Sequence, residues 1–120
     1  MTRGARKEGL SRRHRFAGRG SFTAALRSPR KLRGPALLLH VAAGRPGESR
    51  LGVAITKRLT RSSVDRNRMK RLVREVFRRH GVKTAGLDLV LSPRQPFTGA
   101  VESAWIAELR DLLDRAGQDR

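Results

Sequence analysis

The segment from Arg66 to Arg78 is strongly cationic and amphipathic. Apolar side chains recur in it at the spacing i, i+3, i+4, i+7 and i+8, which places them on one stripe of an α-helix. The stripe consists of Met69, Leu72, Val73, Val76 and Phe77. Basic side chains cover most of the opposite face, and only Glu75 interrupts them with negative charge. Such a helix can pack on a core and still present phosphate-binding groups to solvent.

The whole chain shares this excess of positive charge. Its 120 residues have a formal net charge of +18, far more than solubility requires. A single domain that tolerates this self-repulsion is typical of proteins with a polyanionic partner, and nucleic acid is the first candidate. An anionic membrane is a weaker one, since no segment approaches the ~18 apolar residues of a membrane span. We expect a cytoplasmic protein, because the N-terminus lacks the apolar region of a secretory signal.

The chain has no cysteine, which excludes disulfides, zinc fingers and thiol catalysis. Acidic residues are few, and those of the last predicted helix are interpreted as a solvated face. These are Glu102, Glu108, Asp111 and Asp114. The three histidines do not have metal-ligand spacing, and His40 is interpreted as a packing residue in an apolar strand. The sequence therefore predicts no catalytic residue, no metal site and no organic cofactor.

The pattern along the chain predicts one folded domain between two tails. We expect a disordered basic tail over residues 1–9, an RNA-binding domain over 10–116 and a C-terminal tail over 117–120. The fold class is α+β, a two-layer α/β sandwich with helices on one face of a small sheet. Two strands, 36–42 and 50–56, are expected to form a hairpin across the turn at Gly44 to Gly47. The other expected elements are a short helix over 21–27, an extra strand over 31–35, the basic helix capped by Ser62 and ending near Gly81, a strand over 87–91 and a helix over 98–116.

The basic face of the central helix is better explained by binding than by solvation. Like charges at i and i+4 destabilise an isolated helix by ~0.2–0.5 kcal/mol per pair, so a merely solvated face would more plausibly mix signs. Lys57, Arg58 and Arg61 lead into the helix and extend the patch. Phe16 and Phe22 lie among basic residues, where aromatic rings either stack on bases or belong to the core.

The run RNRMKRLVREVFR, residues 66–78, is very similar to the RNR signature of bacterial ribonuclease P protein subunits. The preceding run RLGVAITKR, residues 50–58, resembles the family strand that ends in paired basic residues. The run LDLVL, residues 87–91, resembles its third strand. These blocks follow the family order over roughly residues 10–113.

The resemblance implies an α/β sandwich with a left-handed β-α-β crossover, against the usual right-handed rule. It also implies that the chain is the small subunit of a ribonucleoprotein endoribonuclease, which removes the 5′ leader of precursor tRNA. A large RNA subunit would carry the active site and most of the bound Mg²⁺. The partners implied are that RNA and the single-stranded leader, with no membrane and no protein partner required.

The resemblance also implies roles for particular residues. The residues expected to contact the catalytic RNA are Lys57, Arg58, Arg66, Asn67, Arg68, Lys70, Arg71 and Arg74. Phe22 and Leu26 would line the leader cleft. Leu26 stands where the family has a second aromatic residue, so apolar contact replaces stacking there.

Three other functions remain alternatives. A ribosomal or general RNA-binding protein would explain the charge but not the full RNR block. A protein-only metal nuclease would need a carboxylate cluster, and a transcription factor would need helix-turn-helix spacing.

Overall fold

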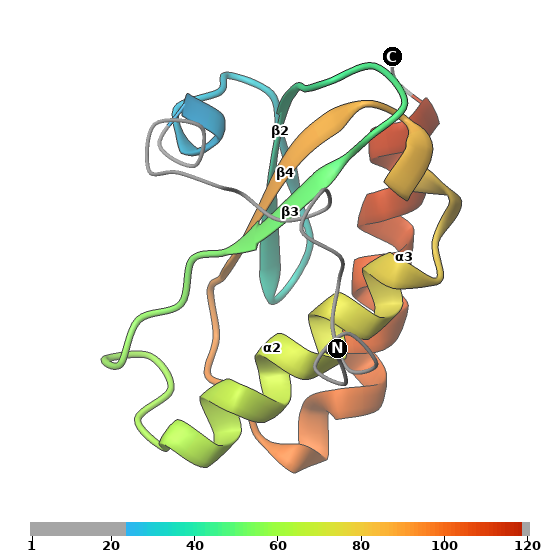
Figure 1. The fold of residues 1–120 in the computed structure, drawn as a ribbon. Helices are drawn as coiled ribbons and strands as arrows, with labels where there is room; N and C mark the ends of the chain where they lie inside the picture. The colour runs from blue at the N-terminus through green and yellow to red at the C-terminus, as the bar shows by residue number, and fades with distance from the viewer. Residues whose placement is uncertain (1–23, 119–120) are drawn as a thin grey trace, which may run out of the picture.

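The computed structural model describes residues 24–118, which form one sheet covered on one face by two helices (Figure 1). The strands are β1 (Lys31–Arg33), β2 (Leu37–Ala43), β3 (Arg50–Val53) and β4 (Leu87–Pro93). The helices are α2 (Ser63–Arg78) and α3 (Glu102–Gln118), and the short 3₁₀ segments η3 (Gly81–Thr84) and η4 (Gly99–Val101) precede β4 and α3. The predicted two-layer α+β class is confirmed, as is the extra short strand.

The pairing of the strands differs from the prediction. The sheet order is β1-β2-β4-β3, so β4 lies between the two strands that were expected to form a hairpin. β2 pairs antiparallel with both β1 and β4, while β3 pairs in parallel with β4. The predicted turn exists, since Glu48 N–H donates to the Arg45 carbonyl at 3.1 Å, but the chain beyond it passes to the far side of β4. β3 is also shorter than expected and ends at Val53.

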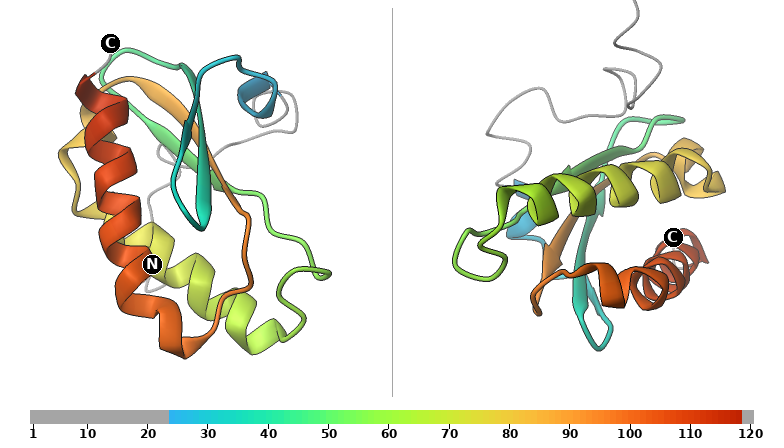
Figure 2. Two further views of the ribbon diagram at one scale, coloured as in Figure 1. Left: turned by 180° about the vertical axis from the view of Figure 1, so that it is seen from behind. Right: turned by 90° about the horizontal axis from the view of Figure 1, so that it is seen from below.

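The chain reaches β4 from β3 through α2, a β-α-β connection between parallel neighbours. Viewed from the helices with these strands pointing up, β4 lies to the left of β3 (Figures 1 and 2). The crossover is therefore left-handed, the sense that the family resemblance implies and the opposite of the common one.

The core lies between the sheet and the two helices. Strand residues alternate between the two faces of a sheet, and Leu37, Leu39 and Val41 of β2 belong to the core cluster. Leu87, Leu89 and Leu91 of β4 do the same, and α3 contributes Trp105, Leu109, Leu112, Leu113 and Ala116. The ring of Phe97 packs edge-on against Trp105, with 5.1 Å between the ring centres.

The two long helices begin and end for identifiable local reasons. Ser62 caps α2 as predicted, because its hydroxyl accepts the Asp65 N–H at 3.2 Å. Gly81 is not the C-terminal signal that the sequence suggested, since it lacks a positive φ and lies in η3. His80 instead starts η3, with its Nδ1 accepting the Val82 N–H at 2.9 Å. The predicted last helix begins as the 3₁₀ segment η4 and becomes α-helical at Glu102.

Candidate nucleic-acid interface

The orientation of α2 is fixed by its buried stripe. Met69, Val73 and Phe77 are fully buried and Val76 is 9 % exposed, as the spacing predicted. Leu72, at the margin of the stripe, is only half-buried. Because this stripe faces the core, the basic residues of α2 lie on its flanks and its outer side.

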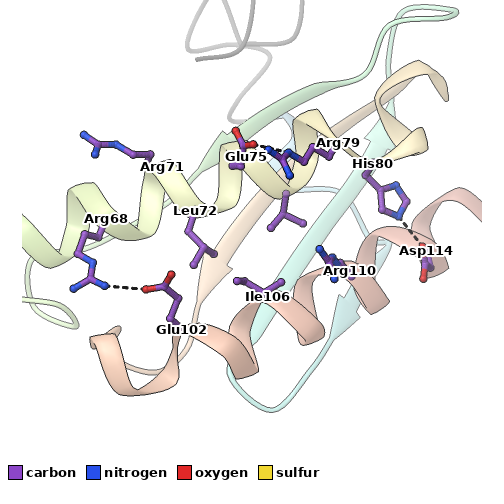
Figure 3. A pocket seen from close by; sticks show the side chains of 11 residues that line it. Arg68, Arg71, Leu72, Glu75, Arg79, His80, Glu102, Ile106, Arg110 and Asp114 are labelled. Carbon is purple, nitrogen blue, oxygen red and sulfur yellow. Dashed lines mark hydrogen bonds and ion pairs between the residues drawn. The ribbon is translucent and has the colours of Figure 1, made fainter. Parts of the chain in front are cut away.

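The structure divides the predicted RNA-contacting residues between two flanks of α2. At about 100° per residue, Asn67, Lys70 and Arg74 follow one another along the flank away from α3. Arg68 lies on the flank toward α3, while Arg71 points outward and away from α3 (Figure 3). Asn67, Arg68 and Arg71 are exposed, whereas Lys70 and Arg74 are half-buried. Lys57 and Arg58 are exposed in the segment before α2 and extend the cationic surface.

Several arginines in α2 and directly after it are paired with acids of the same chain. Arg68 Nη2 donates to Glu102 Oε1 of α3 at 2.9 Å. Glu75 pairs with Arg78 at 2.7 Å and with Arg79 at 2.6 Å. The hydrogen bond from Arg78, aided by both positive charges, lowers the pKa of Glu75 from its ordinary value, and the same bond raises the pKa of Arg78. These pairs orient the guanidinium groups while leaving them largely exposed.

Arg66 has a partly structural role that the sequence did not indicate. Its Nη1 donates to the carbonyls of Thr60 and Arg61, at 2.9 and 2.7 Å. Thr60 is 3 % exposed, and its hydroxyl accepts the Phe97 N–H at 3.0 Å. The first arginine of the RNR run therefore fixes the loop that leads into α2.

Of the two residues expected to line the leader cleft, only Leu26 lies within residues 24–118. Phe16, Phe22 and the predicted tail over 1–9 lie outside the described residues. Leu26 is half-buried in a short helical turn on the side of the sheet opposite to α2 and α3 (Figure 1). Ser28, after this turn, hydrogen-bonds through its hydroxyl to the Val41 carbonyl of β2. This turn therefore lies on the face of the sheet that α2 and α3 leave open.

Polar pairs on the open sheet face were missed by the sequence reasoning. Arg50 of β3 binds both carboxylate oxygens of Asp88 in β4, at 2.9 and 2.7 Å, and each residue is less than 10 % exposed. That hydrogen bond raises the pKa of Arg50. The ring of His40 is hydrogen-bonded to the Ser92 hydroxyl at 2.9 Å, which agrees with its predicted packing role. The alternation of residue types along each strand indicates which polar side chains share a face of the sheet. It does not show which of them pair, because that depends on the strand order.

The acids of α3 were expected to form only a solvated face, and for Glu108 this is wrong. Its Oε2 accepts the backbone N–H groups of Ala36 and Leu37, at 2.9 and 2.7 Å. Glu102, Asp111 and Asp114 do lie at the surface, each in an ion pair with a basic side chain. Within residues 24–118 no group of three His, Cys, Asp or Glu side chains is placed to hold a metal ion. No helix in this range is long and apolar enough to cross a membrane.

The family model described as Ribonuclease P matches residues 10–117 of this chain. The chain belongs to the ribonuclease P protein family. It is 40 % identical over 112 residues to the ribonuclease P protein component of Pseudomonas syringae pv. tomato, covering 92 % of this chain and 84 % of that protein. It is 38 % identical over 87 residues to the ribonuclease P protein component of Nitrosomonas europaea, covering 72 % of this chain and 73 % of that one.

Solved structures of ribonuclease P proteins share the fold. The protein from Thermotoga maritima superposes with a TM-score of 0.66 at 24 % identity, covering 88 % of this chain and 97 % of that one. The protein from Staphylococcus aureus gives a TM-score of 0.65 at 20 % identity, covering 90 % and 92 %. The family membership predicted from the RNR run is thus confirmed, and the chain is a protein subunit of ribonuclease P, which acts in tRNA 5′ processing.

Proposed function

We propose that this subunit binds the catalytic RNA of ribonuclease P along the outer side of α2, and that the RNA carries the active site for removal of the 5′ leader. The observation that supports this most directly is the orientation of α2, whose buried stripe leaves Asn67, Lys70 and Arg71 outside the core. The contact set is Lys57, Arg58, Arg66, Asn67, Arg68, Lys70, Arg71 and Arg74. These residues neutralise phosphates and position the RNA, which then performs phosphodiester hydrolysis.

The proposal extends to the substrate and the metal. The single-stranded leader binds on the open sheet face beside the N-terminal region, where Leu26 and Phe22 supply apolar contact. Mg²⁺ is held mainly by the RNA, and the protein raises its effective use by reducing repulsion between RNA and substrate phosphates. The reaction leaves a 5′-phosphate on the mature tRNA and a 3′-hydroxyl on the leader.

The RNA-binding part is tested with the double variant Lys70→Gln and Arg71→Gln in the full chain. Binding to a full-length bacterial ribonuclease P RNA is measured over a range of salt concentrations. The variant should bind more weakly, and the slope of log K against log salt should fall by about one to two, because up to two phosphate contacts are lost.

The matched control is the double variant Arg45→Gln and Arg115→Gln, which removes the same charge away from the outer side of α2. It should bind nearly as the wild type does. Equal loss in both double variants would mean that net charge alone drives binding, and the assignment to α2 would be wrong.

A further inference from the structure

A groove of about 580 Å³ lies between α2 and α3 (Figure 3). Its apolar residues are Leu72 and Val76 from α2 and Ile106 from α3. Leu72 and Ile106 are only half-buried, so apolar surface remains open to an occupant. A volume of this size matches sites that hold small organic groups.

The charges around the groove are of two kinds. Arg68, Arg79 and His80 are paired with Glu102, Glu75 and Asp114. Arg71 and Arg110 also line the groove, and within residues 24–118 neither makes an ion pair or a side-chain hydrogen bond. Arg110 extends from α3 between the two helices, while Arg71 points outward from α2 (Figure 3).

This arrangement favours a flat, neutral aromatic group inside the groove and an anion outside it. The carboxylates of Glu75, Glu102 and Asp114 at the rim would repel a phosphate inside the groove. They can, however, accept hydrogen bonds from the amino groups of a base. An apolar floor beside a guanidinium plane is a surface on which an unstacked nucleobase binds. Arg71 lines the outer edge of the groove and points outward, where it is placed to neutralise a phosphate.

The position of the groove indicates which nucleic acid would supply that base. Arg68 and Arg71 belong both to the groove and to the proposed RNA-contacting set, so RNA lying along α2 passes over it. We propose that the groove binds one unstacked nucleobase of the ribonuclease P RNA, with the base on Leu72 and Ile106 beside Arg110 and an adjacent phosphate on Arg71. This inference rests on the function proposed above.

The test uses the full chain with Arg110→Gln or Ile106→Ser, each bound to a full-length bacterial ribonuclease P RNA. Arg110 is exposed, so its replacement leaves the core intact. Affinity is measured by titration, and the accessibility of unpaired bases is measured by chemical probing with and without protein. Each variant should bind about tenfold more weakly, the typical effect of losing one stacked base. One base that the wild type protects should become reactive in both complexes.

The control is Arg115→Gln, which removes the same charge from the same helix outside the groove. It should keep the wild-type footprint. Arg110→Gln with wild-type affinity and an unchanged footprint would overturn the inference while leaving the proposed function standing. Failure of the wild type itself to bind this RNA would overturn both.

Discussion

Arg66 connects three parts of the molecule through one guanidinium group. It holds the carbonyls of Thr60 and Arg61, and the Thr60 hydroxyl in turn holds the backbone of Phe97, whose ring packs on Trp105. The start of α2, the loop before it and the segment before α3 are thereby fixed to one another. The sequence alone does not distinguish Arg66 from the other basic residues of α2, because its spacing does not indicate that it binds backbone carbonyls of the same chain.

Replacement of Arg66 by Gln should therefore lower stability as well as RNA affinity. Loss of hydrogen bonds from a charged donor costs about 1–2 kcal/mol here, which urea unfolding will detect. Arg58→Gln, at an exposed position in the preceding loop, should leave the free energy of unfolding unchanged. A stable Arg66→Gln protein whose only defect is a reduced salt dependence of RNA binding would contradict the structural role.

His40 is the residue whose environment gives a pH dependence. Burial, with the nearby charge of Lys31, lowers its pKa from the ordinary value of 6.5. Between the lowered pKa and 6.5 the unfolded chain binds more protons than the folded one, so stability falls as the pH drops through this interval. The contribution is fully present above the unfolded pKa.

Urea unfolding at a series of pH values from about 7.5 to about 5.5 tests this effect. The wild type should lose stability more steeply than His40→Gln, which removes the titration and keeps a polar side chain near Ser92. The other ionisable groups are common to both proteins, so the difference between the two curves isolates His40. Parallel curves would show that His40 does not have a lowered pKa.

At the scale of the elements, α3 is attached to the sheet by more than its apolar stripe. Glu108 accepts the backbone N–H groups of Ala36 and Leu37 at the start of β2. Gly34 makes this possible, because a Cβ there would overlap the Glu108 carboxylate. The short β1–β2 turn and α3 thus form one unit, although 71 residues separate Leu37 from Glu108.

Glu108→Ala should destabilise the protein by about 1–3 kcal/mol, because it leaves two partly buried N–H groups without an acceptor. Asp111→Ala is the matched control on the same helix, since that carboxylate makes only an exposed pair with Arg115. Thermal unfolding of both variants measures the effect. Equal melting temperatures would mean that water replaces the carboxylate without cost.

The local sequence pattern was sufficient to predict most of the helices and strands. The apolar stripe predicted α2 and its buried residues, Ser62 predicted its start, and the near-continuous apolar run over residues 36–42 predicted β2. The glycine at position 81 led us to expect the end of α2 near Gly81. The helix ends at Arg78 instead, because His80 caps the 3₁₀ segment η3 that follows it. Helix ends depend on such local hydrogen bonds more than on residue identity.

At the scale of the whole molecule, the strand order was the main error. Neighbouring strands in the chain usually pair, and a tight turn at Gly44 to Gly47 favoured a hairpin. The insertion of β4 between β2 and β3 is stabilised by contacts far apart in sequence. Among them is the buried pair of Arg50 with Asp88, a bond between side chains 38 residues apart that no local pattern reveals.

The outer side of α2 and the open face of the sheet are two surfaces on opposite sides of the molecule (Figure 2). The helices cover one face of the sheet, and the face that they leave open lies on the side of the helical turn at residues 24–26 (Figure 2). We propose that the RNA subunit binds on the outer side of α2 and that the leader binds on the open face. The resemblance supplied these roles, while the structure supplied the intramolecular partners of Arg66, Arg68 and Glu108.

The most direct test is cleavage of a precursor tRNA with a 5′ leader at low Mg²⁺. The reactions contain a bacterial ribonuclease P RNA alone, this protein alone, and both together. We expect correct 5′ maturation at low Mg²⁺ only when both are present, with less stimulation by the Lys70→Gln and Arg71→Gln double variant. Cleavage by the protein alone, or no stimulation by a protein that still binds the RNA, would contradict the proposed function.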